Sequence, residues 1–205
     1  MNPLLLGTAA AFGLSASAGL NTTLPLLIVG LLARAGLIQI SPPYDALASD
    51  VALVGLGVLG LLEIVADRVP VLDSGVQAIQ WPLAAAAGAI LFASQTSVVS
   101  WVSPGLAILV GLLTAGAVHG ARTSVRPAVT LLTGGLGNVA ISSMEDGTAV
   151  VMTLLAALSP MAGLVVVLVL VVVLIVLATW SVRYGLRLAR GARALSSGAP
   201  RTPTP

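Results

Sequence analysis

The sequence predicts an all-α polytopic membrane protein with about six to eight membrane segments. Of its 205 residues, 58% are hydrophobic and only 8% are charged, whereas about a quarter of the residues in a soluble domain are charged. The mean hydropathy is +1.09. At roughly 20 apolar residues per crossing, the crossings and short loops account for the whole length. We therefore expect residues 1–182 to form a single transmembrane domain, with no separate soluble domain.

Four segments have the length and composition of single crossings. The clearest is residues 161–182, which carry no charge and end in Trp180 beside Arg183. An aromatic and basic border of this kind is typical of the membrane surface. The other three crossings are residues 50–68, 80–99 and 103–120, of which the last two are expected to form a hairpin.

Two further regions predict broken helices or re-entrant hairpins. Residues 3–40 and 125–160 are long apolar runs that Gly, Ser, Asn and Pro interrupt, the second of them again at residues 142–147. Such residues free backbone groups that lipid cannot satisfy, so breaks persist only when they are buried in protein or face a watery cavity. The expected helix breaks are Gly19, Asn21, Pro25, Gly134, Gly135 and Gly137.

The arginines predict how the chain is oriented. There are nine arginines and no lysine, and five of the arginines lie in residues 183–205, which we expect to be a cytoplasmic basic helix end followed by a disordered tail. If both broken regions enter and leave on one side, the N-terminus and Arg34 are also cytoplasmic, and Arg68, Arg122 and Arg126 are outside. We expect a multi-pass protein of a bacterial cell membrane with a cytoplasmic C-terminus.

A weak internal similarity suggests a repeat. LLIVGL (26–31) and LLTGGL (131–136) lie 105 residues apart, and each is followed by an acidic loop and an apolar crossing. With the orientation above, halves 1–73 and 119–182 would form an inverted repeat, which in transporters places half-helix ends at a substrate or ion site. Chance similarity between apolar segments is the alternative.

The first cluster of candidate residues is in residues 61–73. Glu63 and Asp67 are four residues apart and share one face of a helix. Two carboxylates at membrane depth could bind a cation or relay protons, because ionisable groups there are costly and tend to be functional. The alternative is that Asp67, Arg68 and Asp73 form an interfacial loop, which leaves Glu63 as the strongest candidate.

The second cluster is in residues 119–146. His119 and Arg126 could bind an anion, and Glu145 with Asp146 could pair with Arg126 across a hairpin. Alternatively, His119 and Arg122 lie at the headgroups and the two acids cap the next helix. Asn138 could offer an oxygen to an ion or join helices by hydrogen bonds. The expected transport or ion path is Glu63, Asp67, His119, Arg126, Asn138, Glu145 and Asp146.

Several function classes lack their motifs. A single histidine excludes H-E-x-x-H, and no G-x-S-x-G or phosphate-binding glycine motif occurs. Cysteine is absent, which removes thiol chemistry and thiolate metal sites. We therefore expect no enzyme, catalytic residue, metal or cofactor. Basic residues do not alternate with aromatic ones, so no nucleic-acid partner is expected.

Three blocks together resemble a known family. They are GLSASAGLNTTLPLLIVGLLARAG (13–36), E-x-x-x-DRVPVLD (63–73) and H-x-x-R…RP…GGLGN…S-x-x-ED (119–146). They resemble the bacterial integral membrane family of domain of unknown function 4126, over about residues 10–165. This resemblance implies a small multi-span membrane protein and leaves its activity open. Arg122 stands where the resemblance leads us to expect a lysine.

The leading functional hypothesis is a transporter or channel-like protein for a small solute or ion. The lipid bilayer, that solute and further copies of the chain are then its expected partners. The first alternative is a structural or accessory protein that packs against partner membrane proteins through glycine-rich helices. A lipid-modifying enzyme that uses the carboxylate pair is the second alternative.

Overall fold

The computed structural model describes residues 2–67, 73–95, 98, 100–134 and 136–197. In these ranges the fold is all-α without a β-strand, which confirms the predicted class, although one isolated β-bridge joins Ile40 and Gln95. The elements are α1 (Pro3–Leu20), α2 (Thr23–Arg34), the 3-10 helix η1 (Tyr44–Ala48), α3 (Asp50–Ala66), α4 (Asp73–Ala93), α6 (Pro104–Thr133), α7 (Leu136–Leu158) and α8 (Pro160–Ser197).

Four helices in the described ranges are long and apolar enough to cross a membrane. These segments are Pro3–Leu20, Pro104–Pro127, Gly137–Leu158 and Pro160–Trp180. The shorter apolar helices are Thr23–Arg34 and Ile79–Ala93. The 17-residue α3 packs on α2 and η1 and exposes most of its apolar side chains. The chain is therefore an all-α membrane protein.

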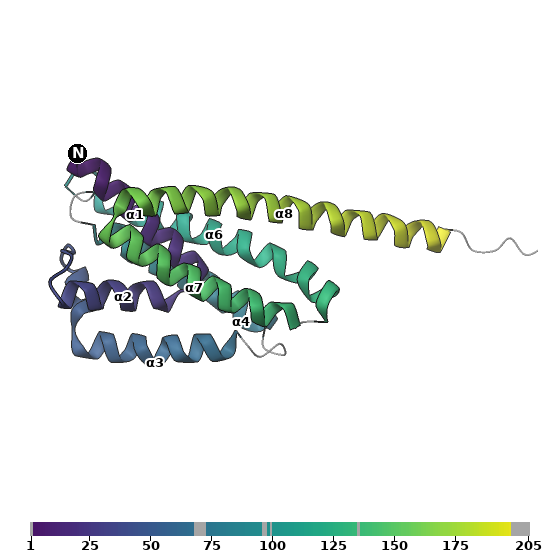
Figure 1. Cartoon of the computed structure of the whole chain (residues 1–205), viewed down its shortest axis with the longest axis horizontal. Helices are drawn as coiled ribbons and strands as arrows, with labels where there is room; N and C mark the ends of the chain where they lie inside the picture. The colour runs from purple at the N-terminus through teal and green to yellow at the C-terminus, as the bar shows by residue number, and fades with distance from the viewer. Residues whose placement is uncertain (1, 68–72, 96–97, 99, 135, 198–205) are drawn as a thin grey trace, which may run out of the picture.

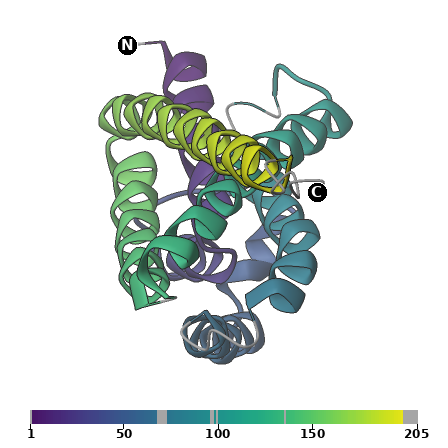
Figure 2. The same ribbon diagram turned by 90° about the vertical axis from the view of Figure 1, so that its right-hand side faces the viewer.

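The helix α1 lies at the centre of the bundle and packs against α4, α6, α7 and α8 (Figures 1 and 2). Its alanines, glycines and serines are mostly buried and allow close approach of the neighbouring helices. A Cβ on Gly19 would lie 2.6 Å from the Ala115 oxygen, and one on Gly13 would lie 2.5 Å from the Ala156 Cβ. Gly19 is therefore a packing position inside α1, and its prediction as a helix break was wrong.

The directions of the helices contradict the inverted repeat. Ser15 Oγ donates to the Gly111 oxygen at 2.8 Å, and Gly19 packs on Val118, so α1 runs parallel to α6. The helices α2 and α7 return from the same end of the bundle (Figure 1). The hairpins α1–α2 and α6–α7 thus point the same way, whereas an inverted repeat requires opposite directions.

In the described part of the second predicted broken region, the helices are interrupted at Gly134 and at Ser159, and not at residues 142–147. The helix α6 continues to Thr133, and Gly134 ends it with a left-handed φ of 62°, the usual role of glycine at a helix C-terminus. The helix α7 then runs unbroken through residues 142–147. A Cβ on Gly137, inside α7, would lie 2.7 Å from Val129 Cγ1, so close packing accounts for this glycine. Gly135 lies outside the described residues.

The unbroken α7 changes the predicted orientation. Pro3, residues 37–39, Gln95 and Pro160 line one cavity at the end of the bundle where α8 begins. The N-terminus and the nearby Arg34 therefore lie opposite the C-terminal end of α8, and the sequence-based placement of both ends on one side was wrong. The helix α8 continues to Ser197 and projects beyond the other helices (Figure 1), while the predicted tail at 198–205 lies outside the described residues.

Candidate functional site

The break between α1 and α2 is organised by one buried amide. Asn21 Oδ1 accepts from the backbone nitrogens of Thr23 at 3.1 Å and Leu24 at 2.8 Å. These bonds satisfy nitrogens at the start of α2 that have no partner within the helix. Asn21 Nδ2 donates to Asp146 Oδ1 at 3.0 Å and so ties the break to α7. Pro25 lies in the first turn of α2, where proline is tolerated, and is not itself the break.

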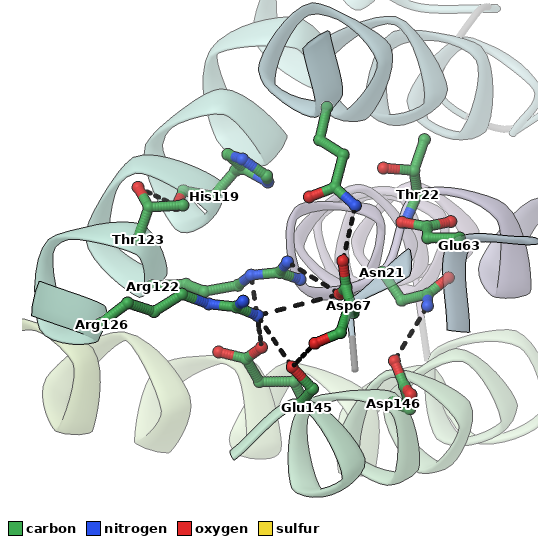
Figure 3. Close-up of polar contacts among 12 residues, drawn as sticks. Asn21, Thr22, Glu63, Asp67, His119, Arg122, Thr123, Arg126, Glu145 and Asp146 are labelled. Carbon is green, nitrogen blue, oxygen red and sulfur yellow. Dashed lines mark hydrogen bonds and ion pairs between the residues drawn. The ribbon is translucent and has the colours of Figure 1, made fainter. Parts of the chain in front are cut away.

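Glu63 lies at the N-terminus of α2. Its Oε1 accepts from the Thr22 nitrogen at 3.0 Å, and its Oε2 accepts from the Thr23 nitrogen at 3.1 Å and hydroxyl at 2.7 Å (Figure 3). The positive end of a helix dipole and free N–H groups together favour an anion at this position. The negative charge of Glu63 is therefore held by α2, and three donors already occupy its carboxylate.

Asp67 connects α3 with two other helices. It is the C-cap residue of α3, and its Oδ2 lies 3.4 Å from Arg122 Nη2 and 3.8 Å from Arg126 Nη2. Its Oδ1 accepts from Gln80 Nε2 at 2.8 Å. Oδ1 therefore faces a donor on α4, and Oδ2 faces donors on α6.

Glu145 faces the same two arginines from α7. Its Oε2 lies 2.7 Å from Arg126 Nη2 and 3.4 Å from Arg122 Nε. Arg126 Nη2 also donates to Ser142 Oγ at 3.2 Å. We call Asp67, Arg122, Arg126 and Glu145 the charged cluster (Figure 3). Its side chains are only 2% to 13% exposed, and its formal charges sum to zero.

Three buried polar atoms near this cluster have no hydrogen-bond partner among the described residues. They are His119 Nε2, Gln80 Oε1 and Arg122 Nε. The contact of Arg122 Nε with Glu145 is thus an ion pair without a hydrogen bond. Buried polar groups usually find a partner in protein or water. These three atoms therefore have hydrogen-bonding capacity that the described residues do not use.

The structure brings together most of the residues that the sequence singled out. Asp67, Arg126 and Glu145 meet in the charged cluster, where His119 is also buried near the arginines. Glu63 and Asp146 are held at the adjacent α1–α2 break. Asn138 stands apart, since its Nδ2 donates to Thr130 Oγ1 at 2.8 Å and joins α7 to α6.

Arg122 is the residue whose role the sequence analysis missed. One of the two sequence-based alternatives placed it at the headgroups, but its side chain is 2% exposed and contacts both acids of the cluster. Its spacing of four residues from Arg126 places both guanidinium groups on one face of α6, a signal that was available. Glu145 and Asp146 lie inside α7, so the alternative that they cap a helix start was wrong. Arg68 lies outside the described residues, and only the backbone of Asp73, at the start of α4, is described.

Two apolar pockets flank the charged cluster. One, between α6, α7 and α8, has a volume of about 210 Å³ and is lined by Arg122, Arg126 and Glu145 at its polar part. The other, between α2, α3 and α4, has a volume of about 420 Å³ and reaches Glu63 and Gln80. In the described ranges, no group of three His, Cys, Asp or Glu residues could hold a metal ion.

A bundle of apolar helices around a buried charged cluster defines a multi-helix membrane protein with a polar site inside the protein. The chain belongs to the family described as domain of unknown function (DUF4126), whose model matches residues 8–180. This confirms the resemblance seen in the sequence. The comparisons with curated proteins and with solved structures gave no match.

Proposed function

We propose that this protein is a transporter or channel-like protein for a small solute or ion, whose path passes the charged cluster. The observation that carries the proposal is the burial of two arginines with two carboxylates inside an apolar bundle. Charges in such surroundings are costly, and in membrane proteins they mark substrate or ion paths. An apolar cluster of similar volume would serve stability alone as well or better.

The contacts within the cluster support a site in which each arginine can change the carboxylate with which it pairs. Arg126 lies 2.7 Å from Glu145 but 3.8 Å from Asp67, and Arg122 lies 3.4 Å from each acid. If a proton neutralises one acid, the arginine that it releases can pair with the other acid. If an anion binds one arginine, the acid that it displaces can pair with the other arginine. Two such pairings would provide the two states that alternating access requires.

The helix break next to the cluster is a second supporting observation. The break at Asn21 and Thr22 places the N-terminus of α2 beside Glu63. Interrupted helices in transporters often present a half-helix end to the substrate. Glu63 occupies that end in this state, so we propose that it is a gating or coupling group on the path.

The orientation is part of the proposal. Arg122, Arg126 and the arginine-rich end of α8 lie toward one end of the bundle, and Arg34 lies toward the other. Arginines concentrate on the cytoplasmic side of membrane proteins. We therefore propose a bacterial cell membrane protein whose C-terminal end is cytoplasmic, with no catalytic role.

The test is flux into proteoliposomes that contain the purified full-length protein. A panel of inorganic ions and small organic acids is screened first, and the strongest flux is then measured for Glu63→Gln and Arg126→Gln. Both variants should lose flux while a matched variant of an exposed arginine, Arg34→Gln, retains it. Equal flux in Glu63→Gln and the parent protein would remove Glu63 from the path.

The alternative is a structural or accessory membrane protein. It is favoured by the exposed apolar side of α3, whose main packing partners among the described elements are α2 and η1. This alternative predicts no flux for any solute in the panel and a stoichiometric partner that copurifies in mild detergent. The mass of the purified particle would also report the predicted homo-oligomer.

A further inference from the structure

The pocket between α6, α7 and α8 combines a charged end with an apolar wall. Two buried guanidinium groups, those of Arg122 and Arg126, line it together with Glu145. The remaining lining residues are aliphatic apart from one methionine and one threonine: Leu20, Val125, Ile141, Met144, Thr148, Leu170, Val173, Leu174 and Leu177. A ligand that fits has a negative group at one end and hydrocarbon at the other.

Arg122 retains donor capacity for such a ligand. Among the four contacts between arginines and acids in the cluster, only the contact of Arg126 with Glu145 is short, at 2.7 Å, and the others lie at 3.4 to 3.8 Å. Within the part of the chain that the structure describes, Arg122 Nε makes no hydrogen bond although the residue is 3% exposed. A planar guanidinium group matches the two oxygens of a carboxylate and binds them in a bidentate manner.

The volume limits the size of the ligand. A cavity of about 150 Å³ holds a molecule of the size of benzene, and typical drug-sized pockets start at about 300 Å³. The pocket of about 210 Å³ therefore accommodates a ligand of about six to ten non-hydrogen atoms. A bare inorganic ion would leave most of it empty.

The other pockets fit this chemistry less well. The pocket between α2, α3 and α4 has Glu63 at its polar end and no arginine in its lining to balance the charge of an anion. The pocket between α1, α6 and α8 has no charged lining residue. The combination of buried arginines and an aliphatic wall thus distinguishes the α6–α7–α8 pocket from these two.

We propose that this pocket binds a small alkyl carboxylate, with its carboxylate on Arg122 and Arg126 in the place of Glu145 and its chain between α7 and α8. Because the alkyl carboxylate would be the substrate of this site, the proposal rests on the proposed function. Binding itself is measurable without flux. The same chemistry can come from a soluble short-chain acid or from a membrane fatty acid.

The test is equilibrium binding of radiolabelled octanoate to the full-length protein in lipid nanodiscs, with empty nanodiscs as the blank. Octanoate should bind roughly tenfold to a hundredfold tighter than octan-1-ol, because only the acid makes charge-assisted hydrogen bonds. Equal binding of the acid and the alcohol would overturn the proposal. Palmitate that binds more weakly than octanoate identifies a soluble acid, and palmitate that binds more tightly identifies a membrane fatty acid.

Two pairs of variants locate the site. Arg126→Gln should lose the preference for the acid, whereas Arg34→Gln should keep it. Val173→Trp should block binding, because Val173 lines the pocket and is 45% exposed. Val172→Trp should not block binding, because Val172 is 60% exposed and does not line the pocket. Unchanged binding in both Arg126→Gln and Val173→Trp would refute the site even if one variant folds poorly.

The outcomes also separate this inference from the proposed function. Octanoate binding that depends on Arg126 and Val173, together with no flux of any tested solute, supports the site and overturns the transport proposal. Flux of another solute without octanoate binding supports transport and overturns the carboxylate site.

Discussion

At the scale of single residues, the charged cluster is stable because its two arginines and two carboxylates neutralise one another. Each buried arginine faces both Asp67 and Glu145, and Gln80 and Ser142 supply the neighbouring hydrogen bonds. Removal of one partner from a buried pair leaves an uncompensated charge, which costs more than the pair contributes. The consequence can be measured as stability, independently of transport.

Asp67→Asn should lower the free energy of unfolding by about 3–5 kcal/mol, because it leaves the arginine charge in excess in a buried site. The measurement is reversible unfolding of the purified protein in mixed micelles. Arg34→Gln is the control, since its ion pair with Asp50 is exposed and exposed pairs contribute about 0–1 kcal/mol. A similar loss in both variants would contradict a compensated cluster.

Asn21→Ala should destabilise the protein by roughly 2–4 kcal/mol, as it removes a helix cap and leaves Asp146 without its amide donor. Asn21→Asp is the informative comparison, because it preserves the cap but places a second carboxylate beside Asp146. If alanine and aspartate variants were both as stable as the parent, the break would not depend on this amide.

At the scale of elements, close helix contacts position the site. A Cβ on Gly88 would lie 2.2 Å from the Ala115 Cβ, and one on Gly111 would lie 2.5 Å from the Gly88 oxygen, so α4 and α6 are in backbone contact. The sequence predicted this kind of packing from its glycine and alanine content. It could not predict which glycines pack and which break a helix, because that depends on the neighbouring helix.

Gly111→Ala should destabilise the protein by about 1–3 kcal/mol, since the added methyl group meets α4 backbone that cannot easily move. Gly57→Ala on α3 is the matched control. Apart from its own stretch of helix, no described residue has an atom within 4 Å of its added Cβ, and alanine favours helix over glycine by up to about 1 kcal/mol. Thermal unfolding in detergent should therefore shift in opposite directions, and parallel shifts would contradict the close contact.

Contacts between elements also explain why the predicted break inside α7 was wrong. The polar run at 142–147 was interpreted as a break because it interrupts a long apolar stretch. Three of its side chains find partners on other elements: Ser142 and Glu145 on Arg126, and Asp146 on Asn21. Such partners lie 16 to 125 residues away in sequence, so a pattern along the chain cannot reveal them.

At the scale of the whole molecule, the unbroken α7 determines which ends share a side. The fold class and two of the four long crossings, Pro104–Pro127 and Pro160–Trp180, were predictable, because they depend on length and hydropathy. The side of the membrane on which each residue lies was not predictable, since one misassigned crossing reverses the side assigned to every residue before it. The positions of Arg122 and Arg126 were reversed with respect to the C-terminal end for this reason.

Cysteine labelling tests the sidedness, and the native chain contains no cysteine. Ser103→Cys and Ser159→Cys, at the starts of α6 and α8, should react with an impermeant reagent from the side opposite the C-terminus. Thr133→Cys, at the α6–α7 turn, should react from the C-terminal side. Labelling of Thr133→Cys and Ser159→Cys from the same side would mean that α7 does not cross.

The zero formal charge of the cluster has an electrical consequence. A transmembrane potential does work on moving charge, about 2.3 kcal/mol per elementary charge per 100 mV. If the two arginines and two carboxylates move together, their contributions cancel and voltage does not bias the movement. The voltage dependence of any flux would then report the charge of the transported species alone.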